Sequence, residues 1–163
     1  MILIKPRPVF CALNFRLTAV LLHWVCYITI PKCMLKDPCI QVINDITGCH
    51  AFLLNDLYSY QCEVSIAQQN AAGKISKGII NAIVPVMHDQ NVGEQEAINY
   101  LQGYVSQLED NFLDAAKNAK LCYSGNDLEL LEKYVNTLEV MCAGNAKWSA
   151  VCGRYNCFVS VRK

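Results

Sequence analysis

The segment NDLYSYQCE, residues 55–63, places an amide, a hydroxyl and a carboxylate four residues apart, at Asn55, Ser59 and Glu63. Residues at this spacing lie one above the other on the same face of an α-helix. The three side chains would form a row of oxygen atoms about 12 Å long, at a rise of ~1.5 Å per residue. This mixed set carries one full negative charge, which suits a hard cation that keeps water or phosphate oxygens as further ligands. The segment is therefore a candidate site for a metal ion bound to a diphosphate, and the alternative is a solvated polar stripe on an amphipathic helix.

Apolar residues recur at helical spacing on both sides of this segment, and no stretch alternates apolar and polar residues as a strand would. The sequence therefore predicts an all-α chain, with helices over residues 40–71, 79–88 and 94–120 and a further helix after residue 126. The apolar stripes of the last two helices comprise Ala97, Leu101, Tyr104, Val105, Leu108 and Phe112, and Leu128, Leu131, Tyr134, Val135, Leu138 and Met141.

Proline, glycine and capping residues predict where these helices begin and end. Pro31 and Pro38 mark a loop before the first helix, and Pro85 predicts a kink or an early stop in the second. Asn126 is predicted to cap the last helix, because a glutamate three residues later completes a capping box. Gly144 is predicted to separate that helix from the segment that follows it.

Length and composition predict one folded domain and exclude two classes of protein. The chain has 163 residues, of which 53% are hydrophobic and 17% are charged, and this composition excludes a disordered chain. Fourteen basic and fourteen acidic residues cancel, so no basic surface for nucleic acid is expected. The oligomeric state does not follow from composition.

The ten cysteines predict reduced, mostly buried thiols in a cytoplasmic protein. They are scattered, with no C-x-x-C pair and no Cys/His spacing typical of zinc. A secreted disulfide framework is the alternative that ten cysteines raise.

An apolar run at residues 17–30 is predicted to form a buried helix. It is fourteen residues long, against the ~20 that span a bilayer, and no small-residue cleavage site follows it. No membrane association is therefore expected, and a signal anchor is the alternative.

Residues 55–63 match the pattern (N/D)D-x-x-(S/T)-x-x-x-E of class I terpene synthases. About ninety residues later, WSAVCGRY at residues 148–155 resembles the closing segment of that family, which ends in an Arg-Tyr pair. The resemblance covers roughly residues 29–157. It implies an all-α helical bundle, part of the class I terpene synthase fold, with a divergent segment at 1–28 and a partial catalytic domain at 29–163.

The resemblance also implies roles for particular residues. Asn55, Ser59 and Glu63 would bind Mg²⁺, with Mn²⁺ as the alternative ion, and Asp56 would be turned away and hydrogen-bonded structurally. The pair Arg154 and Tyr155 would bind the substrate diphosphate. Phe52 and Trp148 would line the hydrocarbon pocket, where aromatic faces stabilise a carbocation, or would be plain core residues. No catalytic acid or base is assigned.

The chain departs from the family pattern in three respects. It contains no Asp-Asp pair for the aspartate-rich motif, and the acidic residues Glu109, Asp110 and Asp114 lie downstream on a predicted surface face. Cys62 stands where many relatives carry a cation, which would weaken diphosphate binding. The length is about half that of the family's catalytic domain, so a truncated or mis-started gene product with family sequence from about residue 29 is expected.

The implied function is that of a lyase. With Mg²⁺, the protein would ionise a prenyl diphosphate, farnesyl diphosphate by analogy, and cyclise the allylic cation to a sesquiterpene. The alternative is a catalytically inactive fragment that acts, if at all, as a helical interaction protein. The missing aspartate-rich motif favours this alternative.

Overall fold

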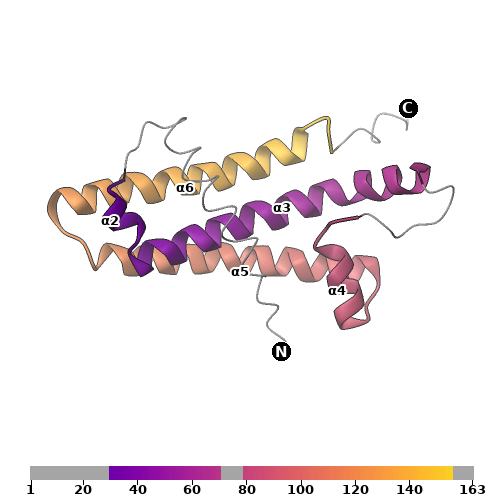
Figure 1. Cartoon of the computed structure of the whole chain (residues 1–163), viewed down its shortest axis with the longest axis horizontal. Coiled ribbons are helices and arrows are strands. Elements are labelled where there is room, and N and C mark those ends of the chain that lie inside the picture. Colours follow the sequence, from indigo (N-terminus) through magenta and orange to yellow (C-terminus); the bar gives the residue numbers. More distant parts are fainter. Residues whose placement is uncertain (1–29, 71–78, 156–163) are drawn as a thin grey trace. The chain divides into compact units, whose positions relative to one another are not determined.

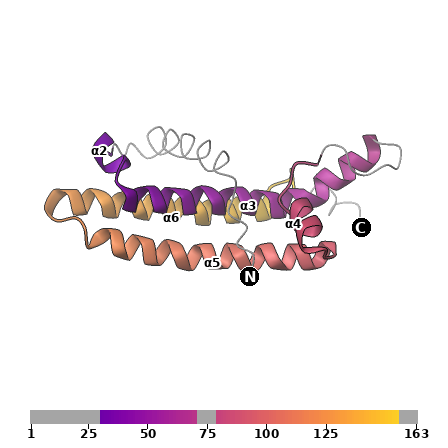
Figure 2. The same cartoon turned by 60° about the horizontal axis from the view of Figure 1, so that its bottom comes forward.

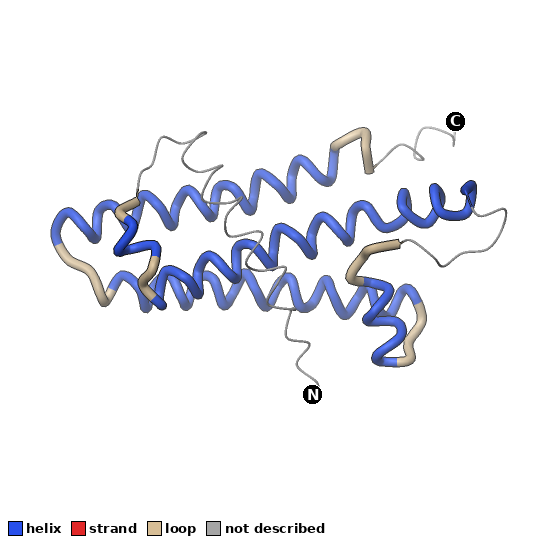
Figure 3. Tube along the Cα trace, viewed as in Figure 1, coloured by secondary structure: helices blue, strands red, loops and turns tan. Residues whose placement is uncertain are grey.

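The computed structural model describes residues 30–70 and 79–155, and within these ranges the chain forms helices and turns only (Figure 1, Figure 3). The predicted all-α class is confirmed. The helices are α2 (Lys32–Leu35), α3 (Pro38–Asn70), α4 (Ile83–Gln90), α5 (Glu94–Lys120) and α6 (Gly125–Val151).

The described chain forms two compact units. The first unit contains residues 30–51 and 107–143, and the second contains residues 52–106 and 144–155, apart from the undescribed residues 71–78. Helices α3, α5 and α6 each contribute residues to both units.

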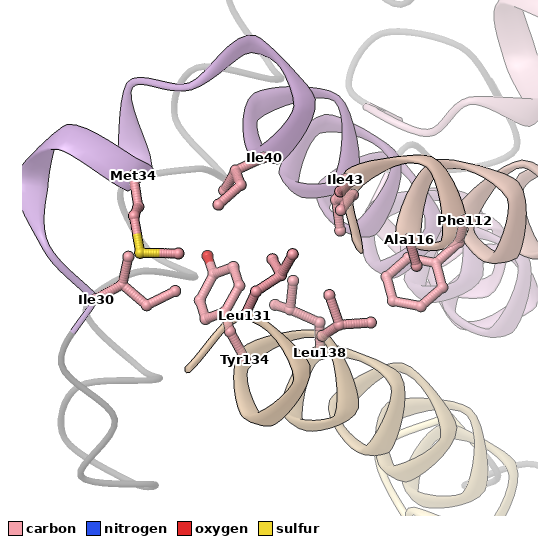
Figure 4. Close-up of a cluster of buried hydrophobic side chains, with 11 residues drawn as sticks. Ile30, Met34, Ile40, Ile43, Phe112, Ala116, Leu131, Tyr134 and Leu138 are labelled. Carbon is pink, nitrogen blue, oxygen red and sulfur yellow. The ribbon is translucent and has the colours of Figure 1, made fainter. Parts of the chain in front are cut away.

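An apolar core fills the first unit (Figure 4). Leu131 and Leu138 of α6 point toward Ile43 of α3, and all three side chains are fully buried. The remaining members of this core come from the start of the described chain and from α2, α3, α5 and α6: Ile30, Met34, Ile40, Phe112, Ala116, Ala119, Tyr134 and Val135. Since apolar burial is the main favourable term in folding, this cluster holds the first unit together.

One polar contact lies inside this apolar core. The Tyr134 hydroxyl donates a hydrogen bond of 2.7 Å to Oδ1 of Asn44, whose side chain is 1% exposed. Nδ2 of Asn44 has no hydrogen-bond partner among the described residues. Burial raises the pKa of Tyr134 to about 12, so the phenol keeps its proton and remains a donor at neutral pH.

A short turn joins α5 to α6 in the first unit (Figure 2). Gly125, the first residue of α6, has φ +56°, a left-handed conformation that glycine adopts without steric cost. Lys120 at the end of α5 lies 3.5 Å from Glu132 of α6, as an exposed ion pair that adds little stability.

In the second unit, α3, α4 and the first part of α5 meet through buried apolar and polar side chains. Ile83, Val86, Ala97 and Leu101 are buried. Gln61 of α3 donates from Nε2 to Oε1 of Glu94, the first residue of α5, over 2.8 Å. The start of α5 is thereby attached to α3.

The sequence predicted α5 with its exact limits, Glu94–Lys120. Acidic residues occupy its first turn and lysines its last turn, which complements the helix dipole. Every residue of the two predicted apolar stripes is buried or half-buried. Asn91 ends α4 in the left-handed conformation, with φ +52°, inside the predicted turn.

Four predicted helix boundaries were wrong. The segment between Pro31 and Pro38 contains the short helix α2, and Pro38 is itself the first residue of α3, where its missing N–H costs nothing. Pro85 neither kinks nor stops α4, because the helix begins at Ile83 and Pro85 lies in its first turn. Asn126 lies inside α6, which begins one residue earlier.

The predicted break at Gly144 was the fourth error, since α6 continues through it to Val151. One glycine in a helix costs only about 1 kcal/mol relative to alanine, which neighbouring helical turns offset.

The prediction for the cysteines was wrong about burial. Among the seven described cysteines, only Cys49 and Cys62 are buried. Cys33 and Cys122 are exposed because they lie in the short helix α2 and in the turn after α5.

The apolar run at residues 17–30 lies outside the described residues, except for Ile30, which is buried in the first unit. Among the helices that are described, none combines the length and the apolar character needed to cross a bilayer.

Leu138→Ala is expected to lower the free energy of unfolding by about 2–5 kcal/mol, because it removes a fully buried side chain and leaves a cavity. Leu113→Ala is the matched control, since Leu113 is 58% exposed and should change stability by less than about 0.5 kcal/mol. Urea unfolding followed by circular dichroism measures both values, and equal effects would contradict the assigned core.

Tyr134→Phe is expected to cost about 1–3 kcal/mol, because it leaves the buried Asn44 carbonyl without its donor. Combining it with Asn44→Leu should restore part of this loss, since no unpaired polar group then remains. The same unfolding measurement checks the pair, with Tyr100→Phe at an exposed tyrosine as the control. Equal destabilisation by Tyr134→Phe and by this control would refute the role of the buried hydrogen bond.

Candidate functional site

The predicted row of oxygen atoms lies on α3 within the second unit. Asn55, Ser59 and Glu63 follow one another at single turns of this uninterrupted helix. The Ser59 hydroxyl donates a hydrogen bond of 2.6 Å to Oε1 of Glu63. Ser59 is buried, whereas Asn55 and Glu63 are half-buried. The side chains therefore share one face, as their spacing predicted.

The segment after α6 reaches this face, as the resemblance implied for the Arg-Tyr pair. The buried Tyr155 donates its hydroxyl hydrogen to Oδ1 of Asn55, one hundred residues earlier in the chain. The Cys62 thiol donates to the backbone carbonyl of Arg154 over 3.1 Å. Cys62 is the uncharged residue that stands where many relatives carry a cation. Its thiol contacts the backbone of the segment that carries Arg154 and Tyr155.

Tyr155 also contacts two neighbours in its own segment. Its ring packs edge-on against Trp148, with 5.7 Å between centroids and an interplanar angle of 81°. The guanidinium carbon of Arg154 lies 5.8 Å from the Tyr155 ring centroid, within range of a cation–π contact. The Arg154 side chain is exposed at the surface of this site.

The proposed pocket residues have different degrees of burial. Phe52 is half-buried, and Trp148 is 51% exposed. That they line a hydrocarbon pocket stays a prediction.

Asn81, which the sequence did not single out, links Glu63 to the start of α4. Its Nδ2 donates to the backbone carbonyl of Asp56 over 2.9 Å and to Oε2 of Glu63 over 3.4 Å. Its Oδ1 accepts from the N–H of Ile83 over 3.1 Å. An asparagine just before an apolar helix is a common N-terminal signal, and this signal would have identified Asn81 and placed the start of α4 correctly.

Asp56 is hydrogen-bonded within the fold, as predicted. Its side chain is 3% exposed, and Oδ2 accepts a hydrogen bond of 2.7 Å from the backbone N–H of Ala82. The pKa of Asp56 is raised to about 6, chiefly by burial and in part by the negative charge of Glu63, while the hydrogen bond from the Ala82 N–H acts to lower it. Asp56 and Asn81 together join α3 to the residues that begin α4.

Each of the two described histidines has a carboxylate neighbour. His50 is buried in the first unit, with Nε2 at 3.2 Å from Oε1 of Glu109. His88 is exposed beside Asp89. Glu109 is exposed, as are the acidic residues Asp110 and Asp114, so the predicted surface position of these three carboxylates is confirmed.

The donor set of the α3 face fits a hard divalent cation. Asn55, Ser59 and Glu63 present amide, hydroxyl and carboxylate oxygens, the ligand types that Mg²⁺ accepts. Within the described ranges, no cluster of three or more histidine, cysteine, aspartate or glutamate side chains could hold a metal ion. A cation at this face would therefore depend on one carboxylate and on oxygens from water or a phosphate.

Asp56→Ala is expected to lower the free energy of unfolding by about 1–3 kcal/mol, because the Ala82 N–H loses its buried acceptor. Asp56→Asn keeps an oxygen acceptor and should be clearly less destabilising. Thermal unfolding of both variants without added metal measures this difference. Equal losses of stability would mean that the carboxylate charge, and not the hydrogen bond, matters to the fold.

Comparison with known proteins adds independent evidence to this geometry. The family described as terpene synthase family 2, C-terminal metal binding, matches residues 13–111, which is more than half of the 163-residue chain. The match contains the α3 face, begins within the segment that the sequence analysis separated as residues 1–28, and ends before Tyr155. The division at residue 28 stays a prediction.

Individual relatives come from fungi and bacteria. Ophiobolin F synthase from Aspergillus clavatus is 30% identical over 132 residues, which are 80% of this chain and 16% of that protein. Sesquiterpene synthase 6 from Postia placenta is 28% identical over 128 residues, 78% of this chain and 34% of the relative. The 10-epi-cubebol synthase from Sorangium cellulosum is 24% identical over 127 residues, 78% of this chain and 37% of the relative.

The chain thus spans between about a sixth and slightly over a third of the length of these relatives. The family match, the helical fold and the meeting of the α3 face with the Arg-Tyr segment all agree. This chain belongs to the class I terpene synthases and corresponds to the C-terminal metal-binding region of that family.

Proposed function

We propose that this chain supplies the face of a class I terpene synthase that binds Mg²⁺ and the substrate diphosphate. The observation that carries this proposal is the hydrogen bond between Tyr155 and Asn55. It brings the α3 face of Asn55, Ser59 and Glu63 next to an arginine-tyrosine pair with diphosphate-binding chemistry. Metal ligands and hydrogen-bond donors to the anion are both needed to hold a diphosphate and to stabilise it as a leaving group.

Asn55, Ser59 and Glu63 would hold the cation, which is Mg²⁺ with Mn²⁺ as the alternative. When bound, the ion supplies positive charge that stabilises the departing diphosphate. Asn81 holds Oε2 of Glu63, and Ser59 donates to Oε1 of the same carboxylate. These two contacts orient the single charged ligand before the metal arrives, which is how surrounding hydrogen bonds tune metal ligands.

Arg154 and Tyr155 would bind the diphosphate oxygens. A guanidinium presents several N–H donors in one plane, and its charge strengthens each hydrogen bond to phosphate. The Tyr155 hydroxyl donates its hydrogen bond to Asn55. When diphosphate is bound, a phosphate oxygen would share this hydrogen bond or accept it in place of Asn55. The Cys62 contact with the Arg154 carbonyl keeps this pair beside the α3 face.

The proposed substrate is farnesyl diphosphate, and the proposed reaction is its ionisation and cyclisation to a sesquiterpene. Several relatives are named as sesquiterpene synthases, which supports this choice of prenyl diphosphate. Phe52 and Trp148 are the proposed aromatic residues near the hydrocarbon chain. A partial terpene synthase catalytic domain at residues 29–163 is part of the same proposal.

The absence of an Asp-Asp pair from the sequence favours the alternative, a catalytically inactive helical interaction protein. Diphosphate binding and turnover therefore need separate measurements. Retained binding without turnover would support the inactive alternative while leaving the metal–diphosphate site intact.

Because only one charged ligand faces the metal, cation binding should be weak alone and at least about tenfold tighter with inorganic diphosphate present. Titration calorimetry of Mg²⁺ and Mn²⁺, with and without diphosphate, measures this coupling. Glu63→Gln should reduce the affinity at least about tenfold. Asp45→Asn is the control, because Asp45 is an exposed carboxylate on the same helix and should leave binding unchanged.

Release of diphosphate from farnesyl diphosphate gives the second measurement. Activity in the parent chain that is lost in Glu63→Gln would exclude the inactive alternative. Metal affinity that is the same in Glu63→Gln, Asp45→Asn and the parent would refute the proposed metal site.

A further inference from the structure

Two cysteines far apart in sequence lie side by side in the first unit, whereas the proposed metal face belongs to the second unit. The sulfur atoms of Cys39 and Cys122 are 4.0 Å apart, which is van der Waals and weak hydrogen-bond contact. Cys39 is the second residue of α3, and Cys122 lies in the turn between α5 and α6. The two thiols belong to segments 83 positions apart in the chain, so tertiary packing alone brings them together.

Asp37 holds both cysteine-bearing segments in place. Its Oδ1 accepts a hydrogen bond of 2.8 Å from the backbone N–H of Cys39, and its Oδ2 accepts one of 2.7 Å from the hydroxyl of Tyr123. Tyr123 directly follows Cys122 in the chain. The Asp37 carboxylate therefore connects the backbone of Cys39 to Tyr123, the residue after Cys122. This connection limits how far the two thiols can separate.

The two thiols differ in their access to solvent. Cys122 is exposed, whereas Cys39 is half-buried. The hydrogen bond with Cys122, followed by partial burial and by the charge of Asp37, raises the pKa of the Cys39 thiol. An oxidant from solution would therefore meet Cys122 first, because the thiolate of an accessible cysteine is the reacting species.

We propose that Cys39 and Cys122 form a dithiol modification site. A low-molecular-weight disulfide oxidises the two thiols, and the resulting Cys39–Cys122 disulfide ties the start of α3 to the α5–α6 turn. The Cys122 thiolate attacks the reagent, its sulfur–sulfur bond breaks, and one thiolate leaves. The Cys39 thiolate then attacks Sγ of Cys122 and displaces the second thiolate. The protein loses two electrons and two protons, and the reagent disulfide becomes two thiols.

Formation of the bond requires the two sulfur atoms to move closer together, from the present 4.0 Å to the about 2.05 Å of a disulfide. The resulting ring encloses residues 39–122, and closing such a long loop restricts the unfolded chain strongly. Oxidation should therefore stabilise the first unit against unfolding.

The test is carried out on the full 163-residue chain, equilibrated with reduced and oxidised glutathione at several ratios and then alkylated. Oxidation should protect two thiols from alkylation and link the tryptic peptide of residues 37–74 to that of residues 121–133, with fragmentation assigning the bond to Cys39. The oxidised protein should unfold at a higher temperature than the reduced protein, and dithiothreitol should reverse this shift.

Variants separate this site from general cysteine oxidation. Cys39→Ser should leave Cys122 as a mixed disulfide with glutathione, and Cys122→Ser should abolish the crosslink. Cys33→Ser, at an exposed cysteine nearby in sequence, should close the bond as the parent does. Tyr123→Phe removes one contact with Asp37 and should slow closure severalfold while the helical circular dichroism spectrum stays unchanged.

Two results would overturn the proposal. In one, both cysteines remain fully alkylatable at glutathione ratios that oxidise other thiols of the chain. In the other, the parent forms mixed crosslinks among several cysteines with no preference for the pair, which would mean that contact between the sulfurs does not direct the chemistry.

Discussion

Three polar side chains of α3, Asn44, Asn55 and Asp56, take hydrogen-bond partners from outside that helix, and these contacts organise both units. In the first unit, Asn44 accepts from Tyr134 of α6. In the second unit, Asp56 accepts from the backbone N–H of Ala82, and Asn55 accepts from Tyr155. A buried polar group without a partner costs about 1–3 kcal/mol, so each of these contacts restricts which segment can pack at that position on α3. Apolar burial supplies most of the stabilisation, and the polar contacts supply the specificity.

Hydrogen bonds from polar side chains also hold Glu63, the one carboxylate of the proposed metal face. Glu63 is held by Ser59 and Asn81, so neutral donors orient its charge. The neighbouring carboxylate, Asp56, is buried and accepts a hydrogen bond from the backbone N–H of Ala82, and burial is the main cause of its raised pKa. The face is therefore weakly charged and suits a cation that brings an anionic ligand with it.

Helical periodicity predicted most of this fold because it reports which face of a helix is apolar. The stripe of α5, which includes Leu101, Leu108 and Phe112, is buried except for the half-buried Tyr104, and the helix has its predicted limits. The errors lay at Pro85, Asn126 and Gly144, where local propensity favoured a break. At Gly144 the helix continues because a single glycine costs only about 1 kcal/mol relative to alanine. At Pro85 and Asn126 the helix begins at a different residue from the one predicted, so each of them lies in a first turn that tolerates it.

The sequence by itself determined the helices, their buried faces and the shared face of Asn55, Ser59 and Glu63, because all of these depend on spacing within one helix. Only the tertiary structure decided that Tyr155 meets Asn55, that Asn81 holds Glu63 and that the sulfurs of Cys39 and Cys122 touch. These contacts join residues between 18 and 100 positions apart. Helical periodicity carries no information about such pairs, since their geometry depends on how separate helices pack against one another.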